Sequence, residues 1–189
     1  MDPLAQGLHE LTAALTGLGI RYMVTGSVAC CARGVIRGTL HGDLVALMFP
    51  AHLKMLCKAL DSSWYADLEM MEAATQSSRA FNLIHIPSAM KFDVFPADTD
   101  FHDSELQRAT MEQLPIEGSL PCVVASAEDC LLSKLQWYRQ GGEVSDRQWG
   151  DIGGILAQNP DLDWAYVNGW AARLGVTDLL AKARVDAEM

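Results

Sequence analysis

The sequence lacks the features that mark secreted, membrane-embedded and generic nucleic-acid-binding proteins. Its N-terminus has no cationic start followed by an apolar core, and no apolar run approaches the roughly 18 to 20 residues of a membrane span. Basic residues are scarce, since 14 Lys and Arg stand against 24 Asp and Glu and leave a net charge of -10. We therefore expect a soluble, cytoplasmic protein with no membrane partner and no generic DNA binding.

The cysteine pattern favours neither a zinc site nor a disulfide framework. The five cysteines are odd in number, lie in apolar surroundings and never form a Cys-x-x-Cys pair: Cys30, Cys31, Cys57, Cys122 and Cys130. Disulfide scaffolds and zinc sites use paired, regularly spaced cysteines. We therefore expect free, buried thiols.

What the sequence does have is a large apolar fraction and two differently patterned parts. Half of the 189 residues are apolar, which is enough for one sizeable core. Strand and helix patterns alternate through residues 1–125, whereas residues 126–189 read as helical throughout. We expect an α+β (mixed α/β) fold, with a mixed sheet flanked by helices in residues 1–125 and a helical lobe, residues 126–189, packed on that core.

Hydrophobic periodicity and turn residues locate the individual elements. The strand patterns occupy residues 20–24, 43–49, 80–86, 90–95 and 120–125. The helix patterns before residue 126 occupy residues 3–18, 27–33, 51–60 and 104–110, with 64–78 read as a helix or an irregular cover and 98–103 as a polar loop. Later helices are expected to begin at Ser126, Ser145, Asp163 and Thr177.

The most informative stretch runs from Ile20 to Phe49. It reads as a strand, a Gly26-Ser27 turn, a short helix and an acidic strand that opens at Asp43. A Gly-Ser pair between a strand and a helix lets backbone N–H groups face a phosphate at the positive end of the helix, and a later acidic strand can hold a cation over that phosphate. The stretch therefore indicates a nucleotide site.

Two aspartates in strand patterns are the candidate cation ligands. A site that holds a cation over a nucleotide phosphate requires carboxylates at two alternating positions of the strand, but the chain reads His41-Gly42-Asp43. Asp93 lies in the strand pattern KFDVF, where alternation sets it among neighbours that would otherwise be half buried. Asp93 is read either as a site residue or as an ordinary ion-pair partner of Lys91.

These residues and two later segments carry a resemblance to a known family. Gly26-Ser27, thirteen residues, a doublet from position 41 to Asp43, and then Asp93 resemble the hG(G/S), Dh(D/E)h and h(D/E)h pattern of the nucleotidyltransferase superfamily, where h is apolar. The segments SAEDCLLSKLQWYR and SDRQWGDI resemble the lysine helix and the Arg-x-x-x-Asp helix of AbiEii-type abortive-infection nucleotidyltransferases and their uncharacterised bacterial relatives. The resemblance covers about residues 11–180 and implies a nucleotidyltransferase-like fold.

The resemblance implies a nucleotide-binding role for several residues. Gly26 and Ser27 match the turn that contacts the outer phosphates through its backbone and hydroxyl. Lys134 matches the helix lysine that neutralises phosphate charge, and Arg147 matches the final polar helix. Arg37, just before the acidic strand, also suits triphosphate binding. Lys134 and Arg147 are equally readable as ion-pair partners of nearby carboxylates.

The resemblance also implies a metal site, from which this chain departs. Asp43 matches the second metal-binding carboxylate, and Asp93 matches the third, which orients or deprotonates the acceptor hydroxyl. His41 stands at the first carboxylate, and Gln148 takes another place that is acidic in the better-known toxins. Because Mg2+ prefers oxygen ligands, we expect weak paired-metal binding that Mn2+ partly restores. His41 is read as a lost ligand, as a substitute ligand or phosphate contact, or as a substitution peculiar to this chain.

The predicted function is NTP- and Mg2+-dependent transfer of a nucleotidyl group to an unknown acceptor, with Asp43, Asp93 and His41 as catalytic candidates. His41 is expected to weaken this activity. The alternative is a catalytically inactive nucleotidyltransferase-like module that regulates or binds, and a third reading is a structural protein with a filled, uncharged cleft near Asp43. The resemblance further implies an RNA, tRNA or protein acceptor and an antitoxin-like protein partner.

Overall fold

The computed structural model of the protein describes residues 2–35 and 38–188. Within them one mixed sheet has the strand order β3-β4-β5-β2-β1-β7-β6. The strands are β1 (Tyr22–Thr25), β2 (His41–Ala46), β3 (Trp64–Tyr65), β4 (Phe81–His85), β5 (Met90–Pro96), β6 (Thr110–Glu112) and β7 (Cys122–Val124). The helices are α1 (Pro3–Gly17), α2 (Gly26–Ala32), α3 (Pro50–Ala59), α4 (Leu68–Gln76), α5 (Asp100–Arg108), α6 (Ala127–Gln140), α7 (Asp146–Gln158), α8 (Trp164–Leu174) and α9 (Thr177–Glu188).

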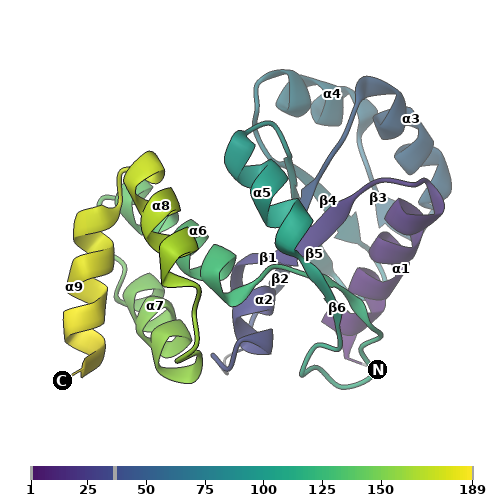
Figure 1. The fold of residues 1–189 in the computed structure, drawn as a ribbon. Coiled ribbons are helices and arrows are strands. Elements are labelled where there is room, and N and C mark those ends of the chain that lie inside the picture. Colours follow the sequence, from purple (N-terminus) through teal and green to yellow (C-terminus); the bar gives the residue numbers. More distant parts are fainter. Residues whose placement is uncertain (1, 36–37, 189) are drawn as a thin grey trace.

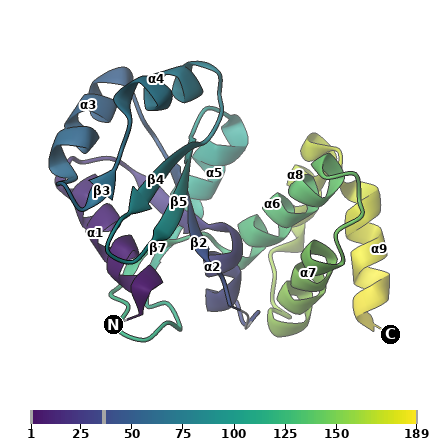
Figure 2. The same ribbon diagram turned by 180° about the vertical axis from the view of Figure 1, so that it is seen from behind.

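The helices α6 to α9 form a group at one side of the sheet, next to α2 (Figures 1 and 2). The helices α1, α3 and α4 lie at the other side of the molecule, and the two termini are far apart in both views. The centre of the sheet, where β1, β2 and β5 run, therefore lies between these two groups of helices.

The pairing of the central strands decides where the acidic residues lie. β1 and β2 are antiparallel, with Thr25 opposite Asp43. β2 and β5 are parallel, with Asp43 beside Asp93. Because side chains directly beside each other on neighbouring strands point to the same face, the two aspartates meet on one face of the sheet.

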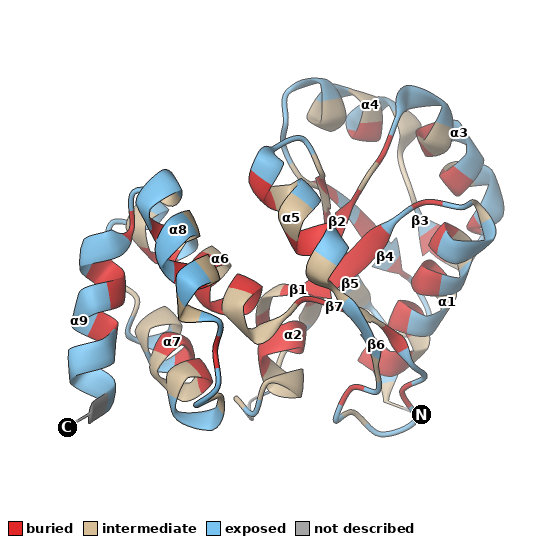
Figure 3. Cartoon of the chain, in the orientation of Figure 1, coloured by how far each residue is buried: buried red, intermediate tan, exposed pale blue. Residues whose placement is uncertain are grey.

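α1 packs its apolar stripe against the sheet. The side chain of Asp2 accepts a hydrogen bond from the backbone N–H of Leu4 and caps the helix, with proline in the first turn. Leu8, Leu11 and Leu15 follow at helical spacing and are each at most 3% exposed. Figure 3 shows the same division, with buried residues along the strands and on the inner sides of the helices.

The helical lobe begins at a capped helix and shares the core of the sheet. Ser126, Ser145 and Asp163 each accept a backbone hydrogen bond at a helix start, as the sequence predicted for the first turns of α6, α7 and α8. Leu131 on α6 and Ile152 on α7 are fully buried. The buried apolar residues of the described chain form one cluster that includes both of them and α1, so the core continues from the sheet into the lobe.

The structure confirms the predicted fold class, a mixed sheet flanked by helices and followed by a helical lobe. β2 differs at its start, because it begins at His41 and not at Asp43. His41 pairs with Lys91 in the β2–β5 ladder, and this contact with a distant segment extends the strand by two residues. The sequence pattern around Gly42 carries no such signal.

The predicted polar loop over residues 98–103 is wrong, because α5 begins at Asp100. The side chain of Thr99 accepts a hydrogen bond from the backbone N–H of His102 and caps this helix. Asp100 and Asp103 are favourable in its first turn, where the helix dipole is positive. The short strands β3 and β6 were also missed, since two or three residues are too few to show a period.

The structure also bears on the absences in the sequence. No helix within residues 2–35 and 38–188 combines the length and the apolar character that crossing a membrane needs. The cysteines of the described residues form no disulfide, and Cys30, Cys122 and Cys130 are buried.

Candidate functional site

The site begins where β1 ends and α2 starts. Thr25 is extended, and Gly26, the first residue of the helix, has a φ of 60°. A Cβ atom at Gly26 would overlap the carboxylate of Asp43 on the neighbouring strand. The backbone N–H of Ser27 donates a hydrogen bond to the same carboxylate. Glycine is therefore required here both for the backbone conformation and for the close approach of Asp43.

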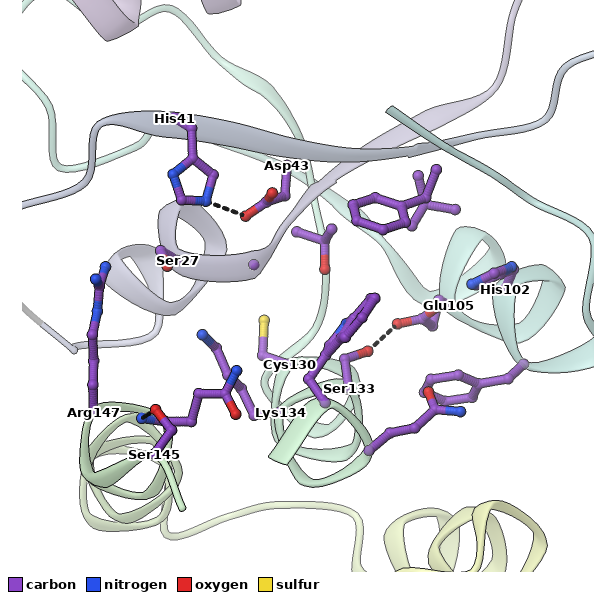
Figure 4. A pocket seen from close by; sticks show the side chains of 18 residues that line it. Ser27, His41, Asp43, His102, Glu105, Cys130, Ser133, Lys134, Ser145 and Arg147 are labelled. Atoms are coloured by element: carbon purple, nitrogen blue, oxygen red, sulfur yellow. Dashed lines mark hydrogen bonds and ion pairs between the residues drawn. The ribbon is translucent and has the colours of Figure 1, made fainter. Parts of the chain in front are cut away.

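Three potential ligands converge beside the start of α2. His41 and Asp43 lie on one face of β2 because they are two residues apart, and Asp93 lies beside Asp43 on β5. One ligand atom from each residue lies within 4.8 Å of those of the other two. His41 Nε2 and Asp43 Oδ2 are 3.6 Å apart. Figure 4 marks this contact with a dashed line.

Lys91 adds a positive charge to this cluster. Its Nζ lies 2.8 Å from Asp93 Oδ2, so the ion pair considered from the sequence is present. Asp93 also lies beside Asp43 in the sheet, so its ion pair with Lys91 does not remove it from the three-residue cluster. Lys91 takes up one carboxylate oxygen of Asp93, and the side chain of Lys91 is itself about half exposed, at 47%.

The cluster is an unfavourable place for a negative charge. Burial raises the pKa of the Asp43 carboxyl above its ordinary value, against the opposing effect of His41. The charge of Asp93 raises this pKa further, while Lys134 lowers it. A cation between Asp43 and Asp93 would lower both the energetic cost of burying these charges and the mutual repulsion of the two carboxylates.

The donor set fits one divalent cation. Two carboxylates and one imidazole supply two oxygen ligands and one nitrogen ligand within reach of a single ion. Mg2+ prefers near-octahedral oxygen ligands, whereas zinc binds imidazole readily and manganese tolerates a nitrogen ligand better than magnesium does. The residues present therefore suit a divalent transition-metal ion better than a pair of magnesium ions.

A cavity of about 420 Å³ opens beside the cluster, between the sheet and the helical lobe. Figure 4 shows His41 and Asp43 at one side of it and Glu105 with His102 at the other. Aromatic and charged side chains share its walls. The filled, uncharged cleft that a purely structural protein would have near Asp43 is therefore absent from the described residues.

Two basic residues reach the cavity from the helical lobe. Lys134 on α6 lies 2.7 Å from Asp151 Oδ2 on α7, and both side chains are buried, so the ion-pair interpretation of Lys134 is correct. Lys134 nevertheless lines the cavity, as do Arg147 and Gln148 in the first turn of α7. Asp151 therefore holds Lys134 at the cavity wall.

The other side of the cavity contains a carboxyl group that sequence reasoning missed. Glu105 on α5 is only 1% exposed, and Ser133 Oγ on α6 donates a hydrogen bond of 2.8 Å to its Oε1. Burial raises the pKa of Glu105 from its ordinary value of 4.5 to about 8, although the bond from Ser133 opposes this change. The carboxyl group is therefore mostly neutral at pH 7.

Glu105 was missed because the start of its helix was misplaced. With a helix from residue 104, Glu105 is a first-turn acid of the kind usually found in solvent. With α5 starting at Asp100, Glu105 lies one turn after Phe101, and Phe101 is 5% exposed. The i, i+4 spacing from a buried aromatic residue is the signal that could have found it.

Most of the predicted site residues meet at the cavity. Its lining includes Gly26, Ser27, His41, Asp43, Lys134 and Arg147. Asp93 belongs to the three-residue cluster but not to the cavity lining. Arg37 lies outside the described residues.

Comparison with known proteins shows similarity of structure without close similarity of sequence. No protein-family model matches the chain. No curated protein sequence matches it significantly.

Three solved structures are similar over nearly the whole chain. A solution structure of the antibiotic-resistance factor ANT(2'')-Ia has a TM-score of 0.57 at 12% identity, covering 96% of either chain. A crystal structure of ANT(2'')-Ia in complex with adenylyl-2''-tobramycin has a TM-score of 0.54 at 14% identity, covering 90% of this chain and 95% of that one. An antigenic nucleotidyltransferase-like protein from Paracoccidioides brasiliensis has a TM-score of 0.54 at 20% identity, covering 95% of this chain and 91% of that one. The chain therefore has a nucleotidyltransferase-like fold.

Proposed function

We propose that this protein is a nucleotidyltransferase that binds an NTP and a divalent cation in the cavity beside β2 and α2. The observation that carries the proposal is the convergence of His41, Asp43 and Asp93 beside a cavity that Lys134 and Arg147 line. A triphosphate needs positive charge along its length, and a metal ion with basic side chains supplies it. The nucleotidyltransferase-like fold supports the same class of reaction.

In the proposed step, a hydroxyl oxygen of the acceptor attacks the α-phosphorus of the NTP. The bond from the α-phosphorus to the oxygen that bridges to the β-phosphate breaks, and pyrophosphate leaves. Asp93, which Lys91 contacts at one carboxylate oxygen, orients the acceptor hydroxyl and accepts its proton. Lys134 and Arg147 stabilise the charge of the leaving pyrophosphate.

The cation would be held by His41, Asp43 and Asp93. When bound there, a divalent ion would supply neutralising charge at the α-phosphate. Since one of the three ligands is an imidazole, we propose that Mn2+ binds more tightly than Mg2+ and that activity with Mg2+ is weak. Ser27 would contact the outer phosphates through its hydroxyl, next to the start of α2.

For the acceptor we propose RNA, tRNA or a protein, as the resemblance to the AbiEii-type enzymes implies, with an antitoxin-like protein as the binding partner. Among the proteins of similar structure, ANT(2'')-Ia is in complex with adenylyl-2''-tobramycin. Small molecules should therefore be tested as acceptors beside RNA, tRNA and protein.

Calorimetric titration tests the proposal. ATP, GTP, CTP and UTP are titrated separately in Mg2+ and in Mn2+, and we expect binding that is tighter with Mn2+. Asp43→Asn and Asp93→Asn should lose the metal-dependent part of the binding, because they remove ligand charge. Asp103→Asn, an exposed position on α5, is the matched control and should bind like the wild type. Absence of binding in every combination of nucleotide and metal contradicts the proposal.

A further inference from the structure

The cavity continues past the metal-ligand cluster in the direction of the strands. Val45 follows Asp43 on the same face of β2, and Phe95 follows Asp93 on the same face of β5. Two residues of a strand advance the chain by about 7 Å. Val45 and Phe95 line the cavity, so this stretch leads from the proposed α-phosphate position toward α5.

The walls of this part of the cavity are aromatic. The rings of Phe95 and Trp137 meet edge to face with centroids 5.6 Å apart. Phe101 lines the same cavity from α5, and Trp137 is 47% exposed on α6. Flat aromatic surfaces of this kind bind planar rings by stacking.

A single hydrogen-bonding carboxyl group ends this aromatic stretch. Glu105 lines the cavity although only 1% of its surface is exposed to bulk solvent, and its Oε1 accepts the bond from Ser133. Figure 4 shows the Glu105–Ser133 pair across the cavity from His41 and Asp43. A neutral carboxyl group offers one O–H donor and one carbonyl acceptor side by side, whereas a carboxylate only accepts.

We propose that the part of the cavity lined by Phe95, Phe101, Trp137 and Glu105 is the nucleobase subsite, and that the carboxyl group of Glu105 pairs with the edge of the base. This inference rests on the proposed function, because the triphosphate must occupy the opposite, basic side near Lys134 and Arg147. A nucleotide that spans from that side past Asp43 reaches the aromatic part with its base. The acceptor then enters elsewhere.

The protonation of Glu105 decides which bases fit. Every base presents a neighbouring donor and acceptor on its pairing edge, so the neutral acid can pair with all four. The carboxylate can pair well only with guanine, whose N1–H and N2–H are both donors. The charged and titratable groups around Glu105 are Asp129 and Lys134 on α6 and His102 on α5, while Arg108 and Tyr166 contact Asp129.

The test compares ATP and GTP binding between pH 7 and pH 9, about one unit either side of the pKa of Glu105. Wild-type affinity for ATP should fall about tenfold over this range, because the neutral form falls from about nine tenths to about one tenth. Affinity for GTP should stay constant or rise. Glu105→Gln keeps one donor and one acceptor without titrating, so it should bind ATP equally at both pH values.

Three further measurements keep the inference separate from the proposed function. Glu105→Leu should weaken all four NTPs by about tenfold, since it leaves the base edge unpaired. Tripolyphosphate with Mn2+ should bind wild type and both variants alike, with the same pH dependence. Asp103→Asn, exposed on the same helix, should leave the ATP pH profile unchanged.

Three results overturn the inference while the proposed function stands. The first is tripolyphosphate and NTP binding in which Glu105→Leu changes no affinity. The second is that the affinities for ATP and GTP depend on pH in the same way. The third is that the Glu105 variants change only the labelling of an acceptor. If neither tripolyphosphate nor any NTP binds the wild type, the proposed function itself fails.

Discussion

His41 sets the charge of the candidate metal site. Its imidazole lies 3.6 Å from Asp43, and together with Asp93 the site offers two negative charges at most. Lys91, 2.8 Å from Asp93, offsets part of that charge. Two divalent cations would therefore leave the cluster strongly positive, so one bound ion is the arrangement that the side chains balance best.

We predict that His41→Asp binds Mg2+ at least about tenfold more tightly than the wild type, because a hard, charged oxygen ligand replaces a neutral nitrogen. The preference for Mn2+ should shrink at the same time. Metal titration followed by labelling from a radioactive NTP measures both effects. His9→Asp adds the same charge at an exposed position on α1 and should change neither.

The labelling result also separates an enzyme from an inactive module. If the wild type transfers label and His41→Asp transfers more, the protein is a weak but working nucleotidyltransferase. Transfer by His41→Asp alone identifies a wild-type protein that binds nucleotide without turnover. Equal Mg2+ affinity in wild type and variant shows that His41 does not set the metal preference.

Glu105 should make the stability of the protein depend on pH. The folded-state pKa is raised from 4.5 to about 8, so the unfolded chain loses this proton first as pH rises. The folded state is therefore favoured most below about pH 4.5, loses stability up to about pH 8, and above that carries a constant penalty of about 3 to 5 kcal/mol.

Glu105→Gln should remove this penalty, because the amide keeps the acceptor for Ser133 and does not ionise. We expect the variant to be more stable than the wild type by a few kcal/mol at pH 9 and nearly equal to it at pH 5. Denaturant unfolding at the two pH values measures the difference. A wild-type stability that falls no more than that of the variant contradicts the buried, neutral state of Glu105.

At the scale of single elements, α2 is the helix whose start is most constrained. Gly26 has a positive φ, and its Cα faces the carboxylate of Asp43. Ser27 donates its backbone N–H to the same carboxylate. The position of Asp43 therefore depends on the backbone of α2 as well as on β2.

Gly26→Ala should destabilise the fold by about 1 to 3 kcal/mol and should displace Asp43. Gly19→Ala is the matched control, since Gly19 also has a positive φ of 68° but has no atom within 4 Å of an added Cβ. Both variants carry the strain of a positive φ, but only Gly26→Ala places a Cβ atom against Asp43. Only Gly26→Ala should therefore lose Mn2+ affinity. Denaturant unfolding and Mn2+ titration measure the two effects, and equal metal affinity in both variants would contradict this role of Gly26.

Over the whole molecule, the sheet and the helical lobe share one apolar core. We propose residues 1–125 and 126–189 as two lobes that fold together. The cavity lies between them, with β2 and β5 on one side and α6 and α7 on the other. Loss of packing in either lobe should therefore disturb the site that both lobes form.

Leu131→Ala should lower the free energy of unfolding by about 2 to 5 kcal/mol, because Leu131 is fully buried on α6. Circular dichroism reports the whole chain, and the fluorescence of Trp137, Trp149, Trp164 and Trp170 reports mainly the lobe. The two unfolding curves should coincide in wild type and variant. Separate transitions would show that the lobes unfold independently.

The sequence was a good guide where structure depends on neighbours along the chain. The helix starts at Ser126, Ser145 and Asp163 follow from side chains that cap the next turn. The alternation of β5 follows from the period of two in a strand, and it correctly placed Asp93 on a half-buried face. These features need no information about the rest of the fold.

The sequence failed where distant segments decide the outcome. β2 starts at His41 because β5 pairs with it. The start of α5 was missed although its signal is local, since Thr99 caps the first turn of that helix. The ion pair of Lys134 with Asp151 joins two helices, and sequence spacing left it open.

By itself, then, the sequence determined the fold class, most of the longer helices and strands, and the presence of Gly26, Asp43 and Asp93 in strand and turn positions. Periodicity and capping are local, so they can be read along the chain. Only the tertiary structure decided that Asp43 and Asp93 lie side by side and that Glu105 lies buried at the far side of their cavity. Strand register and desolvation arise from contacts between distant residues, and those contacts exist only once the chain has folded.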